Sequence, residues 1–188
     1  MIIFGGPRIV GCTTFARALR WPLTSYFTEL VEGTLGPTQV SWRGRQLEAE
    51  LGYRGSYIPP RREATSCSWL SPHAWNRYRH NRIDSLQRAS GVLFVIDSQR
   101  ECALRNVAAL QELASEFSDA GGSLVELPVL FALNKRDLPN ALPVAEVIAA
   151  FQLPICDHIE TCATTGLGVA ESVDRLLAMI DECPATLR

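Results

Sequence analysis

The residues best suited to chemistry in this chain form a short polar string, Asn134-Lys135-Arg136-Asp137, directly after the apolar run Val129–Leu133. The N-K-x-D pattern suits recognition of a guanine ring. The carboxylate accepts hydrogen bonds from the ring N1–H and the exocyclic amino group, and the lysine stem packs along the base. This lysine is the single lysine of the chain, beside seventeen arginines. A solvated polar turn after a strand is the alternative interpretation.

A second candidate begins at Gly6, just after the short apolar run Ile2–Phe4, and extends to Thr14. It has the frame of a phosphate-binding loop, G-x-x-x-x-G-K-[ST], with Cys12 at the lysine position. Successive backbone N–H groups and the start of a helix form an anion-binding nest there, and Thr13 would coordinate Mg²⁺. Taken alone, the frame also fits an ordinary strand–turn–helix junction. The predicted nucleotide-binding residues of this loop are Gly6, Gly11, Cys12, Thr13 and Thr14, with Thr13 as the metal ligand.

A third element is the small-residue loop Thr161-Cys162-Ala163-Thr164-Thr165-Gly166. It follows the last predicted strand and precedes the final predicted helix, where the backbone N–H of Ala163 would reach guanine O6. The predicted base-binding residues of the chain are therefore Asn134, Lys135, Asp137 and Ala163.

The spacing of apolar residues predicts the strands and helices that position these loops. Continuous apolar runs, typical of strands covered on both faces, occupy residues 2–4, 91–96 and 129–133, and residues 155–159 show the pattern more weakly. The segment Val40–Leu51 predicts a hairpin that turns at Arg43-Gly44. Strands that alternate with helices imply an α/β fold with a mostly parallel sheet and helices on both faces.

Three helices are predicted between and after these strands. The first begins at the capping box Ser98-x-x-Glu101, and the second begins at Pro143. The buried face expected for the first helix consists of Leu104, Val107, Leu110, Ala114 and Phe117, and that of the second of Val144, Val147, Ile148 and Phe151. The third and last helix is expected to bury Val169, Val173, Leu176, Leu177 and Ile180.

Length and composition exclude several classes of protein. A chain of 188 residues with 47% hydrophobic residues suits a single domain, residues 1–188, with a proper core. No apolar run is long enough to cross a membrane, and a net charge of −2 argues against a dedicated nucleic-acid binder. Six scattered cysteines without a C-x-x-C pair argue against a zinc site. Without a recognisable secretion signal, the expected location is cytoplasmic.

Together the three loops resemble those of the Ras-superfamily small GTPases, and most closely those of the bacterial MglA polarity GTPases. The strings that carry the resemblance are Gly91-Val-Leu-Phe-Val-Ile-Asp97-Ser98-Gln99, Asn134-Lys-Arg-Asp-Leu-Pro-Asn-Ala141 and Thr164-Thr-Gly-Leu-Gly-Val169. The resemblance implies a Ras-like (P-loop NTPase) fold that binds GTP or GDP with Mg²⁺. It also implies a Roadblock-domain or MglB-like protein partner that accelerates hydrolysis, and a role in cell polarity or motility.

The chain departs from that family where hydrolysis takes place. Counting back from Gly91 puts the D-x-x-G signature on Ser71–Ala74 and the water-orienting glutamine on Trp75, which cannot orient a water. Arg8 puts a long cation at a loop position that is often small in relatives. The switch I threonine is either Thr34 or Thr38.

These departures predict a pseudo-GTPase with weak or absent nucleotide binding, negligible turnover and no catalytic residue to assign. Seven arginines lie from Arg54 to Arg88, together with tryptophans, and this composition is typical of a protein-binding surface. An ordinary solvated helix face and a surface for anionic membranes are the alternative interpretations. The alternative hypotheses are a working GTPase in which Arg8 replaces the missing lysine, and a GTP binder that never hydrolyses.

Overall fold

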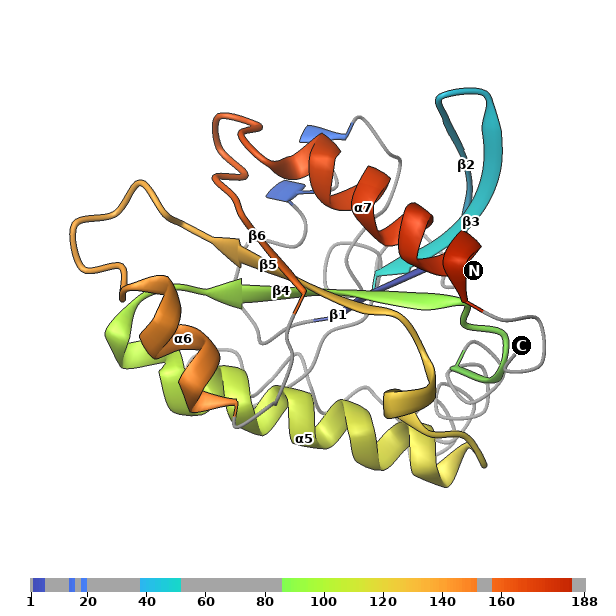
Figure 1. Cartoon of the computed structure of the whole chain (residues 1–188), viewed down its shortest axis with the longest axis horizontal. Coiled ribbons are helices and arrows are strands. Elements are labelled where there is room, and N and C mark those ends of the chain that lie inside the picture. The colour runs from blue at the N-terminus through green and yellow to red at the C-terminus, as the bar shows by residue number, and fades with distance from the viewer. Residues whose placement is uncertain are drawn as a thin grey trace, which may run out of the picture.

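The computed structural model describes residues 2–5, 14–15, 18–19, 38–51, 86–151 and 157–183. Within these residues the strands form one six-stranded sheet in the order β2-β3-β1-β4-β5-β6 (Figure 1). Neighbouring strands are parallel except β2 and β3, which form an antiparallel hairpin. The strands are β1 (Ile2–Gly5), β2 (Thr38–Trp42), β3 (Arg45–Leu51), β4 (Gly91–Asp97), β5 (Val129–Asn134) and β6 (His158–Glu160).

Helices cover both faces of this sheet, as the sequence predicts. Figure 1 shows α7 (Val169–Glu182) on one face and α5 (Ala103–Asp119) with α6 (Val144–Ala150) on the other. Two short 3₁₀ helices, η1 (Arg100–Cys102) and η2 (Leu124–Glu126), lie at the two ends of α5 along the chain. The predicted α/β fold, a mostly parallel sheet with helices on both faces, is therefore confirmed.

The central strand β4 is buried along its whole length because alternate side chains enter two separate cores. Leu93 and Val95 pack with α7 on one face. Val92, Phe94 and Ile96 pack with α5 and α6 on the other. Because the strand is covered on both faces, its sequence from Val92 to Ile96 is apolar without interruption.

The closing helix α7 also anchors the β2–β3 hairpin. Trp42 Nε1 donates to Asp174 at 2.9 Å, and Arg43 pairs with the same carboxylate at 2.7 Å. The hairpin turns at Arg43 and Gly44, which both have positive φ angles of 46° and 82°, as a tight two-residue turn between antiparallel strands requires. The predicted turn is therefore confirmed.

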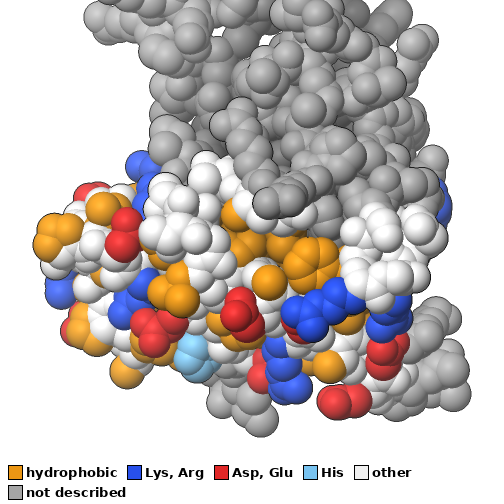
Figure 2. Space-filling view, turned by 90° about the horizontal axis from the view of Figure 1, so that it is seen from above, with side chains coloured by type: hydrophobic (Ala, Val, Ile, Leu, Met, Phe, Trp, Pro, Cys, Tyr) orange, Lys and Arg blue, Asp and Glu red, His pale blue; other side chains and the backbone are white. Residues whose placement is uncertain are grey.

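Acidic and basic side chains lie interspersed on the face seen from above, with apolar side chains between them (Figure 2). Arg45 pairs with Asp181 at 2.8 Å, and Arg175 pairs with Asp157 at 3.0 Å. Opposite charges are thus mixed on the described part of this surface rather than separated into one large basic field of the sort that nucleic-acid binding uses.

The start of α5 differs from the sequence prediction. The helix begins at Ala103 after the 3₁₀ turn η1, and neither element has a side-chain cap, so the predicted capping box is wrong. The Ser98 hydroxyl is fully buried and has no hydrogen-bond partner among the described residues. Glu101 instead accepts hydrogen bonds from Asn140, in the loop after β5.

The predicted buried face of α5 is confirmed only in part: Phe117 is buried, and Val107 and Leu110 pack partly buried against the same core. Leu104 is 86% exposed, whereas Asn106, Ala109 and Leu113 are buried with Phe117. The apolar pattern could not identify this face because its first inward side chain is the polar Asn106. The predicted faces of α6 and α7 are confirmed at Val147 and at all five apolar positions of α7.

Several predicted features lie outside the described residues. They include the phosphate loop before Thr14, the D-x-x-G equivalent at 71–75, Thr34 and the arginine-rich segment before Arg88. Thr38, the other switch I candidate, begins β2. Among the described residues, no helix is long and apolar enough to span a membrane.

Gly168 provides a test of how tightly α7 joins the sheet. It caps α7 with a φ of 70°, and a Cβ there would overlap the carbonyl oxygen of Glu160 at the end of β6. Gly166 has a similar φ of 83°, but a Cβ there would meet nothing within 4 Å. We expect Gly166→Ala to lower the free energy of unfolding by about 1–2 kcal/mol from backbone strain alone.

Gly168→Ala should lower the free energy of unfolding clearly more, because backbone atoms must move as well. Urea denaturation of both variants, monitored by circular dichroism, measures the difference. Equal losses would show that the contact with Glu160 relaxes without cost.

Candidate functional site

The predicted base-binding residues lie at the carboxyl ends of neighbouring parallel strands. Asn134 ends β5, and Lys135 to Asp137 follow it, while Ala163 lies three residues beyond the end of β6. Ligands of open α/β sheets bind at this edge because the loops there converge from several strands. The structure therefore brings together the two loops that the sequence predicts to recognise a base.

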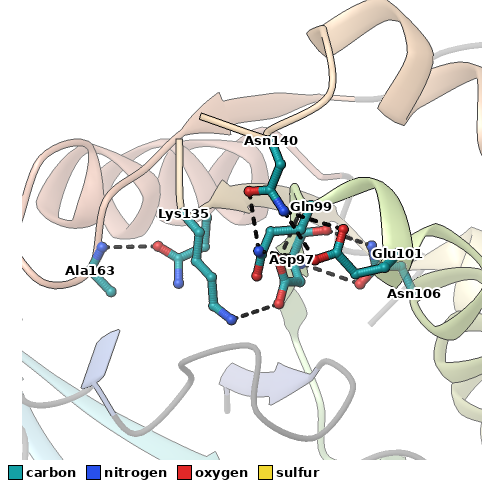
Figure 3. Close-up of polar contacts among 8 residues, drawn as sticks. Asp97, Gln99, Glu101, Asn106, Lys135, Asn140 and Ala163 are labelled. Atoms are coloured by element: carbon teal, nitrogen blue, oxygen red, sulfur yellow. Dashed lines mark hydrogen bonds and ion pairs between the residues drawn. The ribbon is translucent and has the colours of Figure 1, made fainter. Parts of the chain in front are cut away.

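Asn134 joins these loops through its buried carboxamide. Its side-chain Oδ1 accepts the Ala163 N–H at 2.9 Å (Figure 3). The same oxygen accepts the Thr161 hydroxyl at 3.4 Å, and Asn134 is only 2% exposed. On its other side, the Asn134 carbonyl accepts the N–H of Ser98 at 3.1 Å. One residue thus ties β4, β5 and the loop after β6 together.

The Ala163 N–H is therefore already in use. The predicted hydrogen bond from Ala163 to guanine O6 requires that this N–H be shared with Asn134 or released from it. A buried N–H that already has a good acceptor gains less from a new one, because the net value of a hydrogen bond is the difference between the two.

Lys135 makes the shortest ion pair among the described residues. Its Nζ lies 2.6 Å from Oδ2 of Asp97, the last residue of β4, and the two side chains are 24% and 5% exposed. The backbone of Lys135 has a φ of 62°, in the left-handed region that residues with a Cβ rarely occupy. Non-glycine residues keep such conformations where surrounding contacts hold them, often at functional sites.

Arg136 fixes the far side of the same loop. Its Nε donates to Glu160 at 2.7 Å, its Nη1 donates to the Leu142 carbonyl, and its backbone N–H donates to Thr161. Asp137, the next residue, is exposed. Its carboxylate is therefore accessible to a ligand, as base recognition requires.

A polar cluster links the loop after β5 to η1. The Gln99 side-chain amide donates to Asn140 and to Glu101, both at 3.2 Å, and Asn140 donates to the two carboxylate oxygens of Glu101 at 3.0 and 3.2 Å (Figure 3). The backbones of Gln99 and Ala141 also form a bridge. The loop that carries Lys135 is therefore held from both β4 and β6.

Several known proteins are similar to parts of this chain. The chain is 33% identical over 103 residues to the mutual gliding-motility protein MglA of Myxococcus xanthus, 55% of this chain and 53% of the relative. It is 29% identical over 122 residues to the human ADP-ribosylation factor-like protein 4C, 59% of this chain and 62% of the relative. It is 34% identical over 100 residues to the human ADP-ribosylation factor-like protein 4D, 50% and 48% of the two chains.

The chain is a homologue of the Ras-superfamily small GTPases. It spans about half to three fifths of the length of these curated relatives. No model of a protein family matches it. The predicted resemblance to the superfamily and to MglA-type proteins is confirmed.

The phosphate end of this small GTPase homologue is described only from Thr14 onward. Thr14 is partly buried and precedes the fully buried Phe15, which packs against α7. Gly6, Gly11, Cys12 and Thr13 lie outside the described residues, and their roles stay predictions. Among the described residues, no group of three or more His, Cys, Asp and Glu side chains could hold a metal ion.

Two buried cysteines lie beside the base loops, and the pKa values of their thiols are shifted in opposite directions. Hydrogen bonding to Thr164, whose Oγ1 lies 3.1 Å from the Cys162 sulfur, lowers the pKa of the Cys162 thiol. Burial raises the pKa of the Cys102 thiol, and the nearby Asp97 carboxylate raises it further. Both cysteines are buried, so these shifts describe the polarity of the site rather than an accessible nucleophile.

Two residues of the site, Asp97 and Asn106, were not predicted from the sequence. Asp97 was visible only as part of a family string, and Asn106 as a polar residue inside a helix. The available signals were a carboxylate at the end of a buried strand and an asparagine at an inward position of α5, where asparagine is otherwise unfavourable. Neither signal names its partner, because the contacts span 38 and 9 residues of sequence.

Asn134→Leu tests whether this carboxamide holds the two loops together. The near-isosteric change leaves the buried Ala163 N–H without its acceptor. An unpaired buried donor costs about 1–3 kcal/mol, so we expect a loss of that size in the free energy of unfolding of the nucleotide-free protein. Urea denaturation measures it.

Asn140→Leu is the matched control, since Asn140 is exposed and its hydrogen bonds are made in solvent. Its effect should stay within about 0.5 kcal/mol. A loss as large as that of Asn134→Leu would contradict the assigned role of Asn134.

Proposed function

We propose that this chain is a single-domain pseudo-GTPase that retains the guanine-recognising end of a small GTPase site and has lost hydrolysis. The observation that supports it is the bonding of the base loop: Asn134 holds Ala163, and Lys135 pairs with Asp97. By contrast, Cys12 stands at the lysine position of the phosphate loop. Drift toward arginine in an arginine-rich chain would have left a cation at position 12.

The missing phosphate-loop cation weakens binding without abolishing it. Removing one charged partner from a desolvated phosphate contact costs about 2–5 kcal/mol, which corresponds to roughly 30-fold to several thousand-fold in affinity. Gly6, Gly11, Thr13 and Thr14 would still offer backbone N–H groups to the phosphates and, through Thr13, a hydroxyl to Mg²⁺.

Hydrolysis depends on more than binding. It needs the lysine charge, a positioned water and room for an arginine finger. Cys12 removes the first, Trp75 stands at the position expected to orient the water, and Arg8 puts a long cation at a loop position that is often small in relatives. The proposed protein therefore has negligible turnover and no catalytic residue.

Its action is through protein contacts in the cytoplasm, in cell polarity, motility or a related signalling system. The similarity to a gliding-motility protein supports this role, as does the arginine- and tryptophan-rich segment 54–88. The proposed partner is a Roadblock-domain or MglB-like regulator.

Titration with fluorescent GDP and GTP in the presence of Mg²⁺ tests the proposal. The native chain should bind weakly, and Cys12→Lys should tighten binding by about 30-fold or more, because it restores the phosphate-loop cation. Cys12→Ser is the matched control that changes the side chain without adding charge, and it should leave the affinity unchanged. Asp137→Ala should abolish binding, since it removes the acceptor for the base. Stoichiometric GTP or GDP bound to the gently purified native chain would overturn the proposal that the phosphate loop binds nucleotide only weakly.

A working switch is the second candidate function, and the bonded base loop also favours it. In that case Arg8 supplies the missing positive charge. Steady-state phosphate release, measured with and without a Roadblock-domain protein, should then be detectable and should disappear in Arg8→Ala. The pseudo-GTPase proposal expects no phosphate release under either condition.

A further inference from the structure

The single lysine of the chain is held by a carboxylate that is itself fixed in place. Asp97 is 4% exposed, and its Oδ2 lies 2.6 Å from Lys135 Nζ. Its other oxygen, Oδ1, accepts the backbone N–H of Gln99 at 3.1 Å. Because both oxygens are engaged, the carboxylate constrains the flexible lysine more than the lysine constrains the carboxylate.

Asn106 fixes the backbone beneath this carboxylate. It is 2% exposed on α5, its Oδ1 accepts the N–H of Asp97 at 3.2 Å, and its Nδ2 donates to the carbonyl of Asp97 at 2.8 Å (Figure 3). These two bonds attach the last residue of β4 to the helix. A buried asparagine inside a helix is unfavourable unless both its donor and its acceptor are used in this way.

The charge of Lys135 is thus balanced within its own site. The ammonium faces a carboxylate at hydrogen-bond distance, and both groups are largely removed from water. A lysine paired so closely has little net charge to offer to an anion elsewhere, because moving it would leave Asp97 buried and unpaired.

We propose that Asp97, fixed by Asn106, is a positioning residue that holds Lys135 for contact with a guanine base and keeps its charge away from the phosphates. The inference rests on the proposed function, since a guanine nucleotide is the ligand. It explains why the retained lysine does not replace the one missing at position 12. Two measurements test it, one with nucleotide and one without.

The first measurement compares GDP and GTP binding to Asp97→Asn, in the native chain and in the tighter-binding Cys12→Lys background. Loss of the positioned lysine should weaken both nucleotides by about tenfold and leave the ratio of their affinities unchanged. Asp97→Glu, which restores a carboxylate, should recover part of the loss. Glu126→Gln is the matched control, because it makes an acid-to-amide change on an exposed residue of η2, outside the loops that hold Lys135. A rise in affinity for GTP relative to GDP would overturn the proposal, as the released lysine would then serve the phosphates.

The second measurement needs no nucleotide. Because Lys135 is the only lysine, labelling with ¹³C,¹⁵N-lysine gives one set of side-chain NMR signals. An ordered ion pair predicts non-equivalent ε-methylene protons and restricted motion in the native chain and in Glu126→Gln. In Asp97→Asn the ε-methylene signals should merge and the motion should increase. A freely moving lysine in the native chain would overturn the proposal even if Asp97→Asn fails to fold.

The two measurements separate this inference from the proposed function. A native chain with an ordered lysine that binds no guanine nucleotide, even with Cys12→Lys, would overturn the proposed function and, with it, the role of Asp97 in base recognition. Nucleotide binding with a mobile lysine would overturn the positioning role alone.

Discussion

Parallel strands that end together leave backbone groups without sheet partners, and the rest of this site depends on how those groups are satisfied. The buried side-chain carboxamide of Asn134 accepts a hydrogen bond from Ala163 in the loop beyond β6. The backbone carbonyl of Asn134 accepts one from the N–H of Ser98, the residue after β4. Three loops from different parts of the sequence are therefore held in register by one side chain and its peptide group. The position of Lys135 and the exposure of Asp137 follow from that arrangement.

The charged side chains of the site form local pairs on both sides of Asn134. Lys135 pairs with Asp97, and Arg136 pairs with Glu160, so each cation after β5 has an acid on a neighbouring strand. Pairing of this kind orders the base loop without creating a positive field for phosphates. The physical division between an ordered base end and a phosphate end without a lysine is the basis of the proposed function.

Much of the fold could be predicted from the sequence because its signals are local. The continuous apolar runs of β4 and β5, the hairpin turn at Arg43-Gly44 and the apolar face of α7 each follow from residues close together in the chain. The errors occurred where a distant contact decided the outcome. The helix α5 turns Asn106 inward and Leu104 outward because Asn106 bonds the backbone of Asp97, and no pattern of hydropathy contains that bond.

The sequence by itself determined the class of the site: an N-K-x-D string after a buried strand, a small-residue loop before the last helix, and cysteine in place of the phosphate-loop lysine. The tertiary structure decided how those residues are used. It engages the Ala163 N–H with Asn134 and commits the only lysine to Asp97. Residue types specify which hydrogen bonds and ion pairs can form, but only the meeting of strand ends from distant parts of the chain decides which of them do form.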